Sequence, residues 1–152
     1  MTTVQVERQT KITEPMRDLI ALSDQYMTAL YPAESNHLVD LDSLISESFE
    51  FYLLGDRSGY AGCIAIRHFS DYAELKRMFV KKEFRGLGYG RRLLEFAVER
   101  CKRHGHKTIR LETGIYQPEA TSLFEKVGFV KIPPFGSYKP DPLSIFYERS
   151  CV

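Results

Sequence analysis

The chain has 152 residues, of which 43% are hydrophobic and 27% charged, so it can bury one core and we expect a single domain, 1–152. Its formal net charge of +1 excludes the strong positive field typical of proteins that bind nucleic acids or anionic membranes. The N-terminal residues lack the apolar core of a signal peptide, and no later stretch has the length of a membrane span. We therefore expect a cytoplasmic protein.

The three cysteines, Cys63, Cys101 and Cys151, are far apart in the sequence. They show neither a CxxC pattern nor a spacing that would join them to histidine ligands, so we expect no disulfide framework and no metal site. Cys63 lies in an apolar strand, where a free cysteine is usually buried as a small hydrophobe. We do not expect it to be a nucleophile.

Apolar periodicity and turn residues predict an alternation of strands and helices. In the first half we expect a strand at 4–8, a helix at 15–30, a short helical stretch near 38–45, a hairpin of strands at 49–54 and 60–67, and a strand at 72–80. In the second half we expect a helix at 90–104, a strand at 107–112, a helix at 118–127, and strands at 129–132 and 144–149. The proline-rich segment 133–142 is predicted to be a long ordered loop of the kind that often serves function.

The strand at 72–80 carries charged residues in its middle, which is unusual for a buried strand. We interpret them as the border of a wet cleft. Simple alternation places Glu74, Lys76, Met78 and Val80 on one face of this strand and the residues between them on the other.

A glycine-rich turn connects this strand to the next helix. It reads Arg85-Gly86-Leu87-Gly88-Tyr89-Gly90-Arg91. Glycine permits positive φ and the close approach of a ligand, and the first N–H groups of a helix lack internal partners. These amides and the helix dipole suit a pyrophosphate group.

Spacing separates three classes of glycine loop. A dinucleotide-binding loop would need a third glycine where this chain has Arg91, and a P-loop would end in Gly-Lys-Ser/Thr, where this chain has Gly90-Arg91-Arg92. The remaining pattern, Arg85-x-x-Gly88-x-Gly90, resembles the acetyl-coenzyme A signature Gln/Arg-x-x-Gly-x-Gly/Ala of the GNAT N-acetyltransferases.

A second stretch strengthens this resemblance. Residues 117–129 are similar to the second GNAT signature, Asn-x-x-Ala-x-x-Leu-Tyr-x-x-x-Gly-Phe, with Gln117 in the place of Asn and Phe124 in the place of Tyr. The resemblance runs from 60 to 149, roughly two-thirds of the chain. It implies a single GNAT domain of the α/β (α+β) class, with a mixed, mostly antiparallel sheet of about six to seven strands and helices on both faces. It also implies that the sheet is splayed between its fourth and fifth strands.

The resemblance implies acetyl-coenzyme A (acetyl-CoA) as cosubstrate. In this family the end of the central strand offers backbone groups to pantetheine, the glycine loop holds the pyrophosphate, and basic side chains such as Arg85 and Arg91 pair with phosphates. Gln117 is a candidate partner of the pantetheine amide. The implied cofactor-binding residues are Met78, Phe79, Val80, Arg85, Gly86, Leu87, Gly88, Tyr89, Gly90, Arg91, Gln117 and Phe124.

Two glutamates are candidates for the general base. An ammonium acceptor must lose a proton before its nitrogen can attack the thioester. Glu74 aligns with the position where several family members keep a catalytic glutamate, and Glu112 stands near the end of the strand that splays away from the central one. Each could instead be a carboxylate in a salt bridge, and the sequence leaves both roles open.

Phe124 departs from the family pattern. The usual tyrosine protonates the leaving thiolate, which phenylalanine cannot do. Tyr116 and Tyr138 are candidate substitutes, and water is a third source of the proton. The two loops that border the acceptor side in such folds contain His37, Tyr138 and Asp141. The candidate substrate residues are His37, Tyr116 and Asp141.

The resemblance predicts transfer of an acetyl group from acetyl-CoA to a primary amine by direct attack in a ternary complex. The proline-rich loop favours a small-molecule acceptor over a protein amine, that is, a lysine or an N-terminus. A non-catalytic coenzyme A sensor is the alternative that Phe124 raises. Exposed strand edges make a homodimer conceivable.

Overall fold

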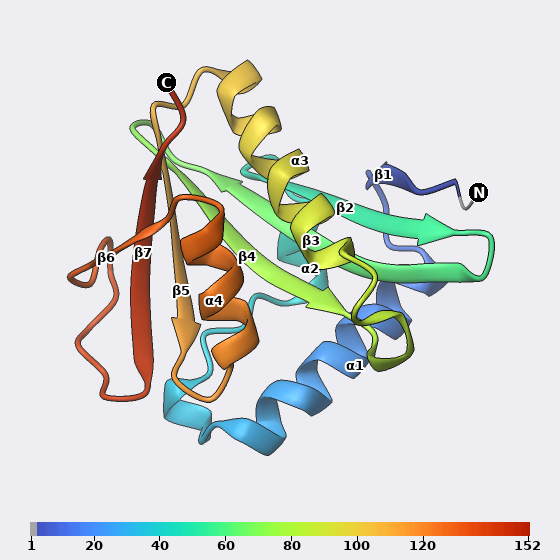
Figure 1. Ribbon diagram of the computed structural model, residues 1–152, viewed down its shortest axis with the longest axis horizontal. Helices are drawn as coiled ribbons and strands as arrows, with labels where there is room; N and C mark the ends of the chain where they lie inside the picture. Colours follow the sequence, from blue (N-terminus) through green and yellow to red (C-terminus); the bar gives the residue numbers. More distant parts are fainter. Residues whose placement is uncertain (1–2) are drawn as a thin grey trace.

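Seven strands form one sheet in the order β1-β2-β3-β4-β5-β7-β6 in the computed structural model, which describes residues 3–152 (Figure 1). The strands are β1 (Gln5–Gln9), β2 (Phe49–Asp56), β3 (Gly59–His68), β4 (Ala73–Val80), β5 (Thr108–Gly114), β6 (Val130–Ile132) and β7 (Ser144–Ser150). The helices are α1 (Glu14–Leu30), α2 (Leu41–Leu44), α3 (Tyr89–His104) and α4 (Pro118–Lys126), with short 3-10 turns η1 (Ala33–Ser35) and η2 (Lys82–Phe84).

The sheet is mixed. β4 and β5 pair in parallel, and the other neighbouring strands pair antiparallel. This arrangement confirms the predicted mixed and mostly antiparallel sheet, and it places the one parallel pair at its centre.

One face of the sheet is covered by α3 and α4 (Figure 1). α3 begins after Gly88 and ends at Gly105, both with positive φ, and between them it buries Leu93, Leu94 and Ala97 against the sheet. Apolar residues at this spacing share one side of a helix, which explains why the sequence predicted α3 closely.

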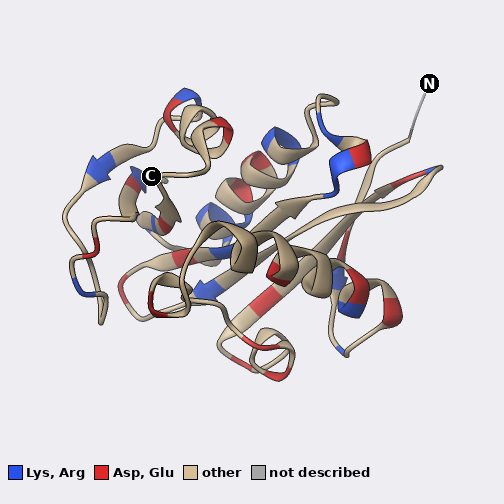
Figure 2. Ribbon diagram, turned by 90° about the horizontal axis from the view of Figure 1, so that it is seen from below, with Lys and Arg blue, Asp and Glu red and all other residues tan. Residues whose placement is uncertain are grey.

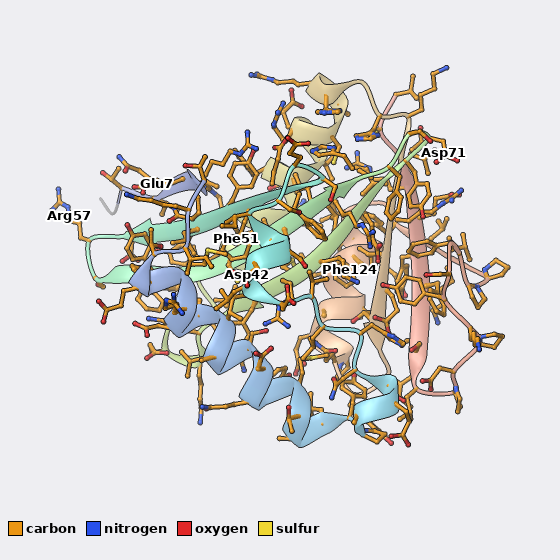
Figure 3. All side chains as sticks on the ribbon, turned by 180° about the vertical axis from the view of Figure 1, so that it is seen from behind. Glu7, Asp42, Phe51, Arg57, Asp71 and Phe124 are labelled. Carbon is orange, nitrogen blue, oxygen red and sulfur yellow. The ribbon has the colours of Figure 1, made fainter. Side chains whose placement is uncertain are left out.

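The opposite face is covered by α1 and α2, as Figure 3 shows from behind. Met16 and Leu19 of α1 and Leu44 of α2 pack with Phe51 of β2 in a second core. The predicted helical stretch near 38–45 is only one turn, Leu41–Leu44, opened by Asp40, whose carboxylate accepts a hydrogen bond from the Ser43 N–H at 2.9 Å. Leu44 is buried in the second core, and Leu41 packs against it.

Charged residues of both signs alternate over the helices and loops (Figure 2), in keeping with the net charge of +1. Within residues 3–152, no helix combines the length and apolar composition needed to cross a lipid bilayer.

Candidate active site

The two central strands separate where the candidate site lies. β4 pairs with β5 only from Ala73↔Ile109 to Leu75↔Leu111. Beyond these pairs β4 continues to Val80 and β5 to Gly114 without pairing to each other. The splay between the fourth and fifth strands is therefore present, and it leaves backbone groups of both strands free for other partners.

A bulge in β4 marks the start of the separation. Cys63 of β3 pairs with Phe79 and Ala65 pairs with Lys76, so β4 has one more residue than β3 between these pairs. Arg77 lies inside the bulge with φ +60°, which a non-glycine residue rarely adopts. A bulge re-aims the side chains that follow it.

The bulge makes the predicted alternation of β4 wrong. Leu75, Met78 and Val80 all pack with the α3 side of the sheet, whereas Phe79 packs with the α1 side. The extra residue shifts the parity of the strand, so Met78 and Val80 do not share the face of Glu74. Arg77 is among the residues that line the inner cavity described below, but its side chain is buried and donates to Asp24 of α1 at 2.7 Å.

Two adjoining cavities open beside the separated strands. The inner cavity, of about 100 Å³, is lined by residues that include Met78, Lys76, Glu112, Gln117 and Phe124. The outer cavity, of about 910 Å³, is lined by residues that include His37, Glu74, Lys76, Tyr138 and Asp141. His37 and Lys76 line both, so the two cavities meet at these side chains.

Glu112 is a half-buried residue of β5 that lines the inner cavity. Burial raises its pKa to about 7, against the smaller opposing effects of a hydrogen bond from Ser144 and the nearby charge of Lys76. The Ser144 hydroxyl donates to Glu112 Oε2 at 2.8 Å. A carboxyl group with such a pKa can exchange a proton with an amine near neutral pH.

Glu74 has different surroundings, in the wall of the outer cavity. The Tyr138 hydroxyl donates to its Oε2 at 2.5 Å, and Lys76 Nζ lies 3.4 Å from the same oxygen and 2.8 Å from the Tyr138 oxygen. Glu74 is thus held by a cation and a phenol, the ion-paired arrangement that was the alternative to a base. Burial and the charge of Glu74 raise the pKa of Tyr138, so its phenol keeps its proton.

Tyr31 is a site residue that the sequence did not indicate. It follows α1, is buried, and lines the inner cavity. Its hydroxyl donates to Gln117 Oε1 at 3.1 Å and accepts from the Tyr116 N–H at 3.1 Å. A side chain at Gly114 would overlap this hydroxyl, so the glycine at the end of β5 is required for Tyr31 to reach α4.

The glycine loop has the backbone expected of an anion site. Gly86 and Gly88 both have φ +81°, and a Cβ on either would meet nothing within 4 Å, so the space beside the loop is open. Gly88 has no side chain with which to cap α3, so the first amides of the helix are left for a ligand. These features fit the diphosphate of a coenzyme A molecule.

The other residues of the glycine loop differ in whether their side chains could contact a ligand. Tyr89 is buried in the core and donates to Asp56 at 2.5 Å, so only its backbone faces a ligand at the loop. A Cβ on Gly90 would lie 3.4 Å from the side chain of Leu123 in α4. Arg91 is half exposed beside Glu95, and Arg85 donates to the Val80 carbonyl at 3.1 Å.

The candidate residues of the acceptor side meet around the outer cavity, with one exception. His37 packs edge-on against Tyr138, with ring centroids 5.2 Å apart, and Asp141 accepts from the Ser35 hydroxyl at 2.7 Å. Tyr116 is half exposed and stacks on Tyr31, and it is outside the residues that line the two cavities. The thiol of Cys63 is fully buried, and burial raises its pKa to about 12, which argues against a covalent cysteine route.

Comparison with known proteins identifies the fold and the family. Residues 16–129 match the model of the acetyltransferase (GNAT) family. The chain is 43% identical to a protein of Azospirillum brasilense named IAA acetyltransferase, over 98% of this chain and 99% of that protein. A candidate acyl-CoA N-acyltransferase from Klebsiella pneumoniae has a crystal structure with a TM-score of 0.85 and 27% identity, covering 98% of both chains.

A solved structure also shows the ligand class of a protein with this fold. An acetyltransferase of Bacillus subtilis crystallised in complex with CoA has a TM-score of 0.74 and 19% identity, over 97% of this chain and 99% of that one. With a family model that spans most of the chain and a relative similar over its whole length, this chain belongs to the GNAT family of acetyltransferases.

Proposed function

We propose that this protein transfers the acetyl group of acetyl-CoA to the amine of a small molecule, with Glu112 as the general base. The observation that carries the proposal is the position of Glu112, a carboxyl group with a pKa of about 7 in the inner cavity beside the separated strands. Glu74 is the weaker candidate because Lys76 and Tyr138 already occupy its carboxylate.

The reaction needs few groups from the protein. The ionised Glu112 takes a proton from the ammonium group, directly or through water, and the freed nitrogen attacks the thioester carbonyl. A backbone amide of β4 near Met78 or Phe79 is our candidate donor to the oxygen on which negative charge develops. As the new C–N bond forms and the C–S bond breaks, the nitrogen gives its second proton to water and the thiolate takes a proton from water.

The aromatic residues near the site indicate that water, and not a side chain, protonates the leaving thiolate. Phe124 lines the inner cavity and has no proton to give. Tyr138 is engaged by Glu74, and Tyr116 stands outside the cavities, so neither supports the role of acid. Tyr31 is the remaining phenol in the inner cavity, although its hydroxyl proton is directed to Gln117.

The outer cavity supports a small acceptor. Tyr138, Pro140 and Pro142 of the proline-rich loop form part of its wall opposite Pro32 and Glu34, so the loop limits how a polypeptide could approach. A protein amine would need an open groove in place of this wall. The Azospirillum relative is named for IAA, and we include that compound among the acceptors to be tested.

The test measures release of free coenzyme A from acetyl-CoA with polyamines, amino acids, aminoglycosides, IAA and lysine peptides. With an accepted substrate, we expect Glu112→Gln to lower kcat by about 10²- to 10⁴-fold, because the base is lost, and to retain acetyl-CoA affinity. Glu74→Gln is the matched control, since it also neutralises a buried carboxylate beside Lys76, and we expect a much smaller loss.

Other outcomes would assign other roles. If Glu74→Gln abolished turnover and Glu112→Gln did not, Glu74 would be the base. Turnover only with lysine peptides would move the acceptor to a protein amine. Tight binding of acetyl-CoA without turnover on any acceptor would favour a coenzyme A sensor, the role consistent with Phe124.

A further inference from the structure

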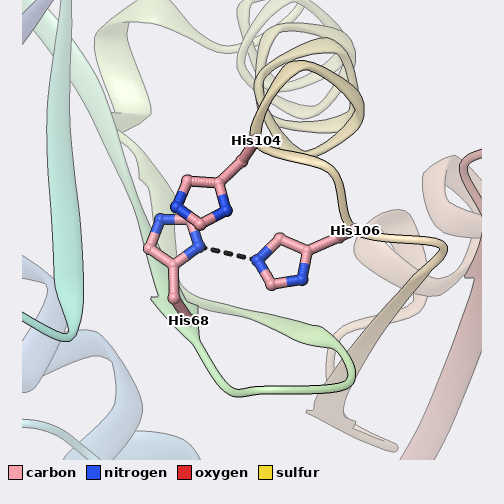
Figure 4. Close-up of side chains that lie close together, drawn as sticks. All are labelled: His68, His104 and His106. Carbon is pink, nitrogen blue, oxygen red and sulfur yellow. Dashed lines mark hydrogen bonds between the residues drawn. The ribbon is translucent and has the colours of Figure 1, made fainter.

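Three of the four histidines of the chain come together away from the two cavities (Figure 4). His68 is the last residue of β3, His104 is the last residue of α3, and His106 lies in the short connection to β5. Each offers a ring nitrogen within 4.8 Å of the others. None of the three is among the residues that line the inner or the outer cavity.

Two of the rings already point nitrogen to nitrogen. His68 Nδ1 and His106 Nε2 are 2.8 Å apart, and the ring planes differ by only 8°. The other nitrogen of His68, Nε2, lies 2.8 Å from Glu50 Oε2. A carboxylate can only accept there, so His68 carries its proton on Nε2 and its Nδ1 lone pair is directed at His106.

Glu50 is held firmly in this position. It is buried, and Arg100 binds both of its oxygens, with Nε at 2.8 Å from Oε1 and Nη2 at 2.9 Å from Oε2. A carboxylate behind the non-ligating nitrogen of a histidine is the usual outer partner of a metal-binding imidazole, since it fixes the tautomer and the direction of the ring. Here the partner is present and oriented by Arg100.

His104 supplies a third imidazole that can turn. It is exposed, and its ring now lies over that of His68, with centroids 3.9 Å apart and planes 16° apart. In this stacked position its lone pair does not point between the other two rings, because lone pairs of imidazole lie in the ring plane. Rotation of an exposed side chain at the end of a helix is enough to direct one of its nitrogens there.

We propose that His68, His104 and His106 form a binding site for one zinc ion, with Glu50 as the outer carboxylate that orients His68. Neutral imidazole suits zinc, and three protein ligands leave one position for water. Zinc–nitrogen distances of about 2.0–2.1 Å in a tetrahedral site put two ligand nitrogens about 3.3 Å apart. The pair at 2.8 Å must therefore open by about 0.5 Å.

The ion replaces the hydrogen that now joins the two rings. His106 Nε2 donates that hydrogen to His68 Nδ1, and on binding it moves to His106 Nδ1, so both facing nitrogens are lone pairs and each ring stays neutral. The bound ion would connect the ends of β3 and α3 to the start of β5. Its expected effect is therefore on stability, and the acetyl transfer site does not depend on it.

Residue spacing reveals only metal ligands that lie close together along the chain, and that criterion could not reveal this cluster. His104 and His106 are two residues apart. His68 precedes His106 by 38 residues and meets them only because the end of β3 lies beside the end of α3 and the connection that follows it. The expectation of no metal site rested on local spacing, and our proposal departs from it.

The test is a calorimetric titration with zinc. The full chain is used without a histidine tag, after a chelator has removed any metal. We expect one ion per chain, and an affinity at least tenfold weaker in His104→Ala and in His106→Gln. His37→Ala is the matched control because it removes the one histidine outside the cluster, and its zinc affinity should equal that of the parent. Cobalt should give the visible absorption of a four-coordinate site in the parent and not in His104→Ala.

Thermal unfolding separates a lost ligand from a lost fold. Without metal, His104→Ala should unfold at the temperature of the parent, since His104 is exposed, and zinc should raise the unfolding temperature of the parent more than that of this variant. The absence of zinc binding to the parent, or equal affinity in the parent and in a folded His104→Ala, would overturn the proposal.

Discussion

Glu112 and Glu74 are carboxyl groups on neighbouring strands, and their surroundings give them different chemistry. Glu74 faces a lysine and a phenol, which favour a settled ion pair. Glu112 receives one hydrogen bond, from Ser144, and burial dominates its behaviour, so its pKa rises to about 7. Glu74 is itself only 3% exposed, so the difference between the two side chains lies in their partners: a cation and a phenol hold Glu74, whereas Glu112 has no such pair to offset its burial.

The pH dependence of acetyl transfer follows from this shift. A base works only when it is ionised, so we expect kcat/KM to rise with pH through about 7 and then to level off. The measurement is kcat/KM over about two pH units on either side of that value, and Glu112→Gln should lose this rise.

The increase of kcat/KM with pH could come from ionisation of Glu112 or of the acceptor amine, and Ser144→Ala distinguishes the two. The Ser144 hydrogen bond favours the ionised carboxylate, so its removal should raise the pKa of Glu112 and move the rise to higher pH. The ionisation of the free amine would not change. A profile identical to that of the parent would contradict Glu112 as the titrating base.

At the scale of elements, the junction of β4 and α3 combines a demanding backbone conformation with the loop that we propose binds coenzyme A. The chain leaves the sheet at Val80, turns through two glycines with positive φ, and enters α3 with uncapped amides. The same helix ends at Gly105, with φ +102°. Both ends of α3 therefore need a glycine with positive φ, but only the first end presents unpaired helix N–H groups.

Substitution at the two ends separates these roles. We expect Gly88→Ala to destabilise the protein by about 1–2 kcal/mol, because alanine is strained in the left-handed conformation, and to weaken coenzyme A binding. Gly105→Ala should cost a similar free energy and leave coenzyme A affinity unchanged. Urea unfolding and calorimetric titration with coenzyme A measure the two effects, and equal losses of affinity in both variants would count against the loop as the phosphate site.

At the scale of the molecule, the two larger of three hydrophobic cores in the described residues lie on opposite faces of one sheet. α3 and α4 cover one face and α1 and α2 the other, and the strands contribute alternate side chains to each. Leu93 of α3 belongs to the first core and Leu53 of β2 to the second, and both are fully buried. Because the same strands supply both cores, we expect the domain 1–152 to unfold as one unit.

Two leucine substitutions test this coupling. Leu93→Ala and Leu53→Ala should each lower the free energy of unfolding by about 2–5 kcal/mol, with the same denaturant slope as the parent. Leu87→Ala is the control, because Leu87 is 59% exposed, and it should change stability by less than about 0.5 kcal/mol. Two separate transitions in either core variant, or a loss confined to one spectroscopic probe, would show that the cores unfold independently.

Much of the fold could be read from local patterns. α3 and α4 were predicted because their apolar residues recur at helical spacing between glycines and proline that begin or end them. The glycine loop was predicted because its spacing and its place between a strand and a helix are local properties. The strand β4 was placed correctly, but its faces were not, because alternation carries no sign of a bulge at Arg77.

The sequence by itself determined the GNAT resemblance, the glycine loop proposed to bind an anion and the set of candidate carboxylates, because these depend on residue type and spacing along the chain. Tertiary structure alone decided that partial burial raises the pKa of Glu112, that Lys76 and Tyr138 hold Glu74, that Tyr31 reaches Gln117, and that three histidines meet. The physical reason is that burial and long-range contacts are set by how strands pair and separate. A single extra residue in β4 changes which side chains face each other, and no local pattern records it.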